Sequence, residues 1–139
     1  MHTQNYQLRK KTFVIVIAIF SIVTLSAFYF QQTPWKAPAS AEAKKNPLTN
    51  DAGTIAAGKT VYNKECLSCH GKSGKGDGQS AAQLDIPAGN FTTTATQDQS
   101  DGALYWKISE GRKPMPSFKK KLNETQIWQS VVYMRTFKK

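Results

Sequence analysis

Histidine and cysteine are scarce in this sequence, with two of each among 139 residues. A structural zinc site needs four Cys or His ligands, and His2 lies far from the other three candidates, so zinc would be short of ligands. The alternation of strands and helices that surrounds a thioredoxin-like C-x-x-C motif is also missing. A disulfide between Cys66 and Cys69 stays open in an oxidising compartment, but it gives His70 no role.

Acidic residues are also few, since nine Asp and Glu stand against 19 Lys and Arg, for a formal net charge of +10. This balance favours partners with acidic surfaces. Nucleic-acid binding is disfavoured because no recognised nucleic-acid-binding fold accompanies the charge. The basic residues of interest in the C-terminal part are Lys72, Lys75, Lys113 and Lys119 to Lys121. For the last three, docking and a merely solvated surface are both open.

Nucleotide-binding motifs are absent from the glycine-rich residues 71–78. This stretch contains neither G-x-x-x-x-G-K-[ST] nor G-x-G-x-x-G, and no predicted strand precedes it. Glycines can adopt positive φ, so we expect a tight loop here instead of a phosphate site.

The two cysteines and the second histidine stand together as Cys66-Leu67-Ser68-Cys69-His70. C-x-x-C-H is the attachment signature of a c-type haem. Two thiols three positions apart can form thioethers to the two vinyl groups of one porphyrin, and the next imidazole can bind the iron. The sequence therefore predicts one covalent haem c held by Cys66, Cys69 and His70, with His70 as the proximal iron ligand.

The distal iron ligand has to be chosen from a short inventory that includes three methionines. Met1 lies at the extreme N-terminus, and Met134 falls in register with apolar residues of a predicted helix, which assigns it to the core. Met115 lies between two prolines that keep it out of a helix and in a stiff loop. We therefore predict Met115 as the distal ligand. An iron with both axial positions filled has no vacant site for a substrate, which favours electron transfer over catalysis.

The first fifty residues differ in composition from the rest. Residues 13–30 are apolar apart from Ser and Thr and carry no charge, and as a helix they would span roughly 27 Å, close to the thickness of a bilayer core. Arg9, Lys10 and Lys11 precede them and predict that residues 1–12 are cytoplasmic. A retained transmembrane anchor and a cleaved signal peptide are both open, and the length of the apolar run favours the anchor.

Residues 31–50 contain three prolines with Ala, Ser and Lys. This composition predicts an extended, mobile linker. Residues 51–139 then predict an all-α haem domain with three main helices. The first covers 51–66 and leads into the haem motif, the second covers 101–110, and the third begins at Asn123 with a capping box.

With these features assembled, the stretch from about Thr54 to Phe137 resembles the class I, single-domain cytochrome c family, and in particular its bacterial, membrane-associated, mono-haem members. The features that carry the resemblance are Gly58-Lys-Thr-Val-Tyr62, Cys66-x-x-Cys-His70, Gly74-x-Gly76-x-Gly78, Pro87 followed by Asn90-Phe91-Thr92, Gly111-x-x-x-Met115-Pro116, and Trp128 with Tyr133.

This resemblance implies a fold of three main helices around one covalently bound haem. It implies that the carbonyl of Pro87 accepts a hydrogen bond from the non-ligating nitrogen of His70, and that Gly58 and Tyr62 pack against Tyr133 where the first and last helices cross. It also implies that the haem domain lies on the periplasmic side of the inner membrane.

The predicted function is that of an electron carrier and not of an enzyme. A membrane-tethered cytochrome would pass single electrons from a quinol-oxidising complex or dehydrogenase to a terminal oxidase or reductase, through acidic surfaces of its redox partners. The alternatives are a haem subunit of a multi-subunit oxidoreductase and a gas or redox sensor in which Met115 dissociates. A peroxidase is disfavoured because it would need an open iron.

Overall fold

The three main helices of the domain lie where the sequence predicts them. The computed structural model describes residues 34–138, and its main helices are α3 (Ala52–Glu65), α6 (Asp101–Glu110) and α7 (Glu124–Arg135). Each begins at a side chain that accepts a hydrogen bond from a free backbone N–H group of the first turn. These caps are Asp51, Ser100 and Asn123, and the last forms a capping box with Gln126.

The remaining elements are short. They are α2 (Ala39–Glu42), α4 (Leu67–His70), the 3-10 helix η1 (Ala81–Gln83) and α5 (Thr94–Gln97). No strand is present within residues 34–138, where a single isolated bridge joins Arg112 to Met115. The predicted all-α class is therefore confirmed for the described part of the chain.

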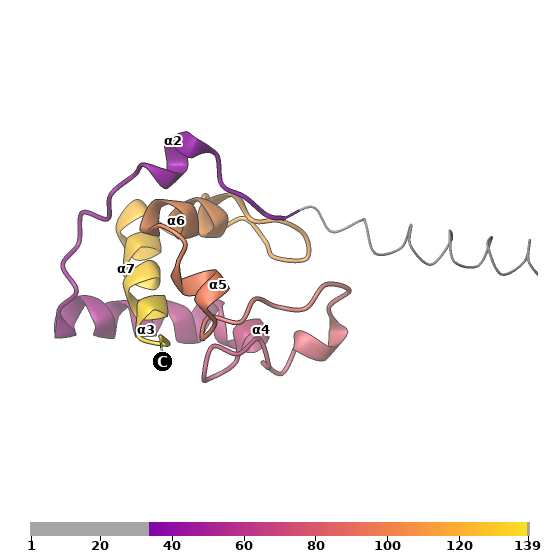
Figure 1. The fold of residues 1–139 in the computed structure, drawn as a ribbon. Helices are drawn as coiled ribbons and strands as arrows, with labels where there is room; N and C mark the ends of the chain where they lie inside the picture. The colour runs from indigo at the N-terminus through magenta and orange to yellow at the C-terminus, as the bar shows by residue number, and fades with distance from the viewer. Residues whose placement is uncertain (1–33, 139) are drawn as a thin grey trace, which may run out of the picture. The chain divides into compact units, whose positions relative to one another are not determined.

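Helices α3 and α7 cross one another (Figure 1), and Gly58 of α3 lies at their close approach. A Cβ atom at Gly58 would lie 2.1 Å from the carbonyl oxygen of Gln129, so only glycine allows this approach of the two backbones. Beside the crossing, the rings of Tyr62 and Tyr133 are 5.1 Å apart, and the Tyr62 hydroxyl donates to the Gly71 carbonyl at 2.7 Å. The predicted contact of Gly58 and Tyr62 with Tyr133 is confirmed.

The core lies between α3, α6 and α7 and contains aromatic and branched side chains. Its buried members are Tyr62, Phe91, Leu104, Ile108, Phe118, Ile127, Trp128, Val131 and Met134. The ring of Trp128 also stacks on Tyr105 of α6 at 4.2 Å. Met134 is buried, in agreement with the core position predicted for it.

Within the predicted linker (residues 31–50), residues 37–41 pack on α6, which corrects the prediction of an extended chain at these positions. Ala37 and Ala41 are buried against Ala103 of α6. A Cβ atom at Gly102 would lie 2.0 Å from the carbonyl oxygen of Ala41, so the two backbones nearly touch. Composition predicted a linker because the segment is rich in Ala and Pro, but small side chains are what such a close approach requires.

The predicted cytoplasmic segment (residues 1–12), the predicted membrane anchor (13–30) and the first residues of the predicted linker lie outside the described residues. Among residues 34–138, no helix has both the length and the apolar character needed to cross a membrane.

Candidate haem site

The haem motif forms one short turn of helix at the end of α3. Cys66 is both the last cap of α3 and the first residue before α4, and its carbonyl accepts hydrogen bonds from the backbone N–H groups of Cys69 at 3.2 Å and His70 at 2.9 Å. This turn brings the predicted attachment residues together. Both cysteines are free thiols, so the disulfide left open by the sequence is not formed.

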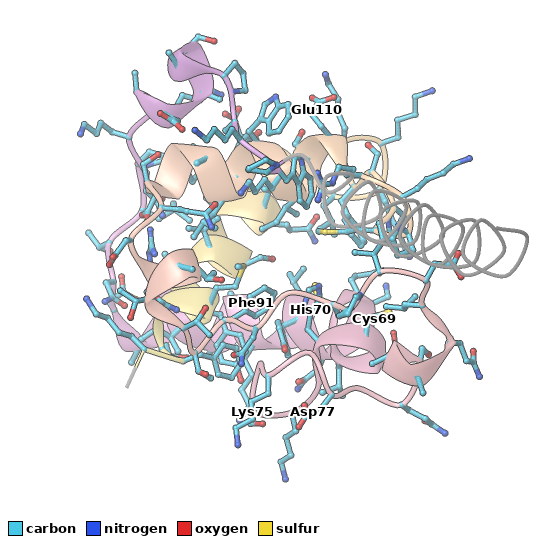
Figure 2. The ribbon with its side chains drawn as sticks, turned by 45° about the vertical axis from the view of Figure 1, so that its right-hand side comes forward. Cys69, His70, Lys75, Asp77, Phe91 and Glu110 are labelled. Carbon is cyan, nitrogen blue, oxygen red and sulfur yellow. The ribbon has the colours of Figure 1, made fainter. Side chains whose placement is uncertain are left out.

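The His70 ring is held in one orientation by two contacts. Its Nδ1 atom lies 3.0 Å from the carbonyl oxygen of Gly89, and because a carbonyl can only accept, Nδ1 must carry the proton. The ring of Phe91 stacks on the imidazole at 4.3 Å between centroids. In Figure 2, Phe91, His70 and Cys69 lie in a row across the middle of the view. The lone pair of Nε2 is therefore left for a metal.

The partner of His70 differs from the one expected, since the hydrogen bond predicted for the Pro87 carbonyl is made by Gly89. The loop beyond Pro87 is held against the glycine-rich loop. The N–H of Phe91 donates to the Gly74 carbonyl at 2.6 Å, and the backbones of Gly76 and Ala88 approach so closely that a Cβ atom at Gly76 would lie 2.3 Å from the Ala88 carbonyl oxygen. The pinned backbone directs the Gly89 carbonyl toward the imidazole, and Pro87 is left exposed.

Burial tunes the titratable groups of the motif. Burial lowers the pKa of His70, and the hydrogen bond to Gly89 opposes this change without reversing it. The imidazole is therefore neutral near pH 7, as a metal ligand must be. Burial also raises the pKa of the Cys66 thiol to about 12, with a further contribution from Glu65.

The glycine-rich residues 71–78 form the predicted tight loop, and this loop is hydrogen-bonded to the haem motif. Gly71, Gly74 and Gly76 all have positive φ. The N–H of Gly76 donates to the His70 carbonyl at 2.9 Å, and that of Gly78 donates to the Cys69 carbonyl at 3.1 Å. These bonds satisfy carbonyl groups at the end of α4. Residues 52–78 and 89–91 are called the attachment side below.

Residues 111–122 form a second loop, called the Met115 loop below. Met115 is half-buried, its N–H donates to the Arg112 carbonyl at 2.9 Å, and its side chain packs against the core cluster, as that of Cys66 does. Phe118 is buried, and its N–H lies 3.1 Å from the Ser109 carbonyl of α6. The structure therefore places Met115 and Cys66 against one apolar core.

Two contributors to the site were missed by sequence reasoning, namely the Gly89 carbonyl and the ring of Phe91. Phe91 is itself positioned by Gln97, whose buried side-chain amide donates to the backbone carbonyls of Phe91 at 2.6 Å and of Met134 at 3.0 Å. An aromatic residue in Gly89-Asn90-Phe91, soon after Pro87, was the available signal. Local sequence does not reveal that its ring meets His70, because the contact depends on how the loop folds back.

The residues present fit a haem c group. Two free thiols and an imidazole with its Nε2 lone pair available lie on one turn, and a thioether lies in a loop on the same apolar core. Apolar surroundings and a fixed imidazole are what haem proteins supply to their cofactor.

Two solved structures resemble this chain. A reducing HAO-like protein complex of Kuenenia stuttgartiensis contains a chain with a TM-score of 0.61 and 29% identity, which covers 81% of this chain and 54% of its own length. The KustC0563 c-type cytochrome matches with a TM-score of 0.52 and 30% identity over 59% of this chain and 98% of its own length. Fold and site together define a c-type cytochrome domain with covalently bound haem c.

The family follows from the sequence comparison. Residues 53–134 match the family described as cytochrome c oxidase, cbb3-type, subunit III, and the chain belongs to this family. It is 32% identical over 91 residues to the cbb3-type cytochrome c oxidase subunit CcoP of Azospirillum brasilense, and 29% identical over 85 residues to cytochrome c6 of Rippkaea orientalis. The matches cover 64% and 60% of this chain, but 30% of the CcoP protein and 70% of cytochrome c6. The chain thus carries a c-type cytochrome domain of this family.

Proposed function

We propose that this protein is a mono-haem cytochrome that carries single electrons between respiratory complexes while tethered to the membrane. The iron of the bound haem supplies the chemistry, because it takes up and releases one electron. The observation that carries the proposal is the orientation of His70, whose Nδ1 is committed to Gly89 and whose Nε2 is left available beside two free thiols.

In this proposal the chain's own residues bind, orient and shield. Cys66 and Cys69 would hold the haem covalently, and its iron would be bound by His70 as the proximal ligand and by Met115 as the distal ligand. The Gly89 carbonyl makes the imidazole a stronger donor, while the methionine sulfur and the apolar core favour the ferrous state. With His70 and Met115 both bound to the iron, the haem would pass electrons and would have no open position for a substrate.

The tether is proposed from the apolar residues 13–30, with the haem domain on the periplasmic side of the inner membrane. Because residues 37 and 41 are buried on α6, only residues 31–36 are left to connect the predicted span to the packed part of the domain. A connection of six residues reaches about 20 Å at most. A short reach, together with membership of a family described as an oxidase subunit, favours action close to a membrane partner such as a terminal oxidase.

Substitution of Met115 or Met134 by leucine tests the ligand set, because leucine keeps the volume and removes the sulfur. Ferric haem with a methionine ligand has a weak long-wavelength absorption band. We expect full-length Met115→Leu to lose this band and to bind carbon monoxide when reduced. Met134→Leu is the matched control and should keep the band. A band that survives in Met115→Leu would contradict the assignment, and a wild-type protein that binds carbon monoxide readily would favour the sensor.

We further propose that exposed lysines attract the acidic surfaces of redox partners, and the salt dependence of electron transfer tests this steering. Lys72, Lys75 and Lys113 are exposed, while two members of the lysine run are in ion pairs, Lys119 with Glu110 and Lys121 with Glu65. Oxidation by an anionic metal complex should slow by about tenfold between low and physiological ionic strength, because salt screens attraction between exposed charges. Oxidation by a neutral complex should be nearly constant. Equal salt dependence for both reagents would contradict steering.

A further inference from the structure

A carboxylate is buried at the point where α3 delivers the haem motif. Glu65 is the last residue of α3 and directly precedes Cys66, yet its side chain is only 6% exposed. A carboxylate is rarely buried without a partner, because its removal from water is unfavourable. Here the partner is the ammonium group of Lys121, which forms an ion pair with Glu65 and is itself 61% exposed.

Lys121 belongs to the Met115 loop, so this ion pair joins the loop to the attachment side. The N–H groups of Lys121 and Leu122 both donate to the Phe118 carbonyl at 2.9 Å, which forms a turn around the buried Phe118 ring. Cys66, Met115 and Leu122 pack against the same core cluster as that ring. The pair therefore connects the two segments that are proposed to hold the iron from opposite sides.

The two charges also act on the Cys66 thiol. After burial, the negative charge of Glu65 is the largest influence that raises the pKa of Cys66, and the positive charge of Lys121 opposes it. A charge that acts on this sulfur acts on the haem bonded to it, because partly buried charges are screened weakly. A negative charge there stabilises the ferric state, and a positive charge stabilises the ferrous state.

We propose that Glu65 and Lys121 form a positioning pair that holds the Met115 loop against the attachment side and sets the reduction potential of the haem. This inference rests on the proposed function, and it adds two residues that neither bind the haem nor coordinate its iron. Glu65 supplies the charge that lowers the potential, and Lys121 offsets it and fixes the loop.

A matched control exists in the same loop. Lys119 and Glu110 form an ion pair at 3.0 Å, but both side chains are well exposed, at 66% and 39%. Exposed pairs of this kind contribute little to stability. Figure 2 shows Glu110 at the end of α6, apart from Cys69 and His70 of the attachment side. Substitution of Lys119 or Glu110 by glutamine removes one charge without touching the buried carboxylate.

The test uses full-length haem-loaded protein and two measurements, the reduction potential and the temperature at which the ferric methionine band disappears. Glu65→Gln should raise the potential, by up to about tenfold in the ferrous-to-ferric equilibrium or about 59 mV. Lys121→Gln should lower the temperature of band loss, because the loop loses its link. Lys121→Arg keeps the positive charge, so its reduction potential and its temperature of band loss should match those of the wild type. Lys119→Gln and Glu110→Gln should change the potential less than Glu65→Gln does and the temperature less than Lys121→Gln does.

Two results would overturn the inference. One is a potential in Glu65→Gln no higher than in Glu110→Gln, and the other is band loss in Lys121→Gln at the temperature found for Lys119→Gln. If Glu65→Gln fails to accumulate with haem, the difference between Lys121→Gln and Lys121→Arg decides. A different result would contradict the proposed function, namely a wild-type protein without the methionine band. In that case the comparison of reduction potentials would still decide the role of the Glu65–Lys121 pair.

Discussion

The attachment side and the Met115 loop hold their functional side chains by different means. On the attachment side, Cys66, Cys69 and His70 lie within one helical turn that continues from a capped helix, and the loop after it closes with backbone hydrogen bonds. In the Met115 loop no helix surrounds the methionine. Its position depends on contacts with α6, the core and the end of α3.

The two regions therefore differ in how far along the chain the residues lie that fix the functional side chains. The geometry of His70 is fixed mainly by residues within about twenty positions along the chain, from Cys66 to Phe91. The Met115 loop depends on residues more distant in sequence, such as Glu65, together with the neighbouring α6. We therefore expect changes on the attachment side to cost folding and haem binding together, and changes in the Met115 loop to cost distal ligation first.

The largest effect is expected on removal of the covalent haem. In the double variant Cys66→Ala, Cys69→Ala, the small domain loses the cofactor proposed to fill the centre of its core, and we expect it to be largely unfolded. Far-UV circular dichroism should show most of the helical signal lost. Unchanged dichroism with a cooperative melt would mean that the attachment side is stable without haem, and the comparison drawn above would fail.

A smaller effect is expected at the crossing of α3 and α7. Gly58→Ala places a methyl group 2.1 Å from the Gln129 carbonyl oxygen, and neither helix can shift without disturbing the core, so we expect a loss of about 3 kcal/mol. Gly53→Ala is the control in the same helix, because its Cβ meets only the Asp51 side chain, at 3.2 Å. Denaturant unfolding of the haem-loaded proteins measures both. Equal stability of the two variants would show that the crossing is more tolerant than its geometry implies.

The smallest loss of stability is expected in the Met115 loop. Gly111 has a φ of +67° and ends α6, and a Cβ there would lie 2.5 Å from the Pro116 backbone. Because a loop can move, we expect Gly111→Ala to cost about 1–2 kcal/mol, with a marked weakening of the methionine band. A band as stable as in the wild type would show that Met115 does not depend on this turn.

Much of the fold could be predicted because its signals are local. The capping box at Asn123 and the apolar register of α7 depend on residues a few positions apart, and both were confirmed. The packing of residues 37–41 on α6 was not foreseen. A short alanine-containing segment has no periodic signal of its own, and its burial depends on Gly102, far along the chain.

The candidate site was likewise predicted in part from the sequence. The motif Cys66-Leu67-Ser68-Cys69-His70 indicated the cofactor, because attachment chemistry requires those residue types at that spacing. The partner of His70 was assigned to Pro87 and proved to be Gly89, since the hydrogen bond depends on how Gly74 and Gly76 pin the loop.

The sequence by itself determined the haem chemistry and where the main helices begin, because spacing and capping act over a few residues. Only the tertiary structure decided which carbonyl orients His70, that Phe91 stacks on it, and that Glu65 is buried beside Lys121. These contacts join residues that come together only when the loops fold back on the helices. A local sequence pattern does not predict which residues far apart in the chain will meet.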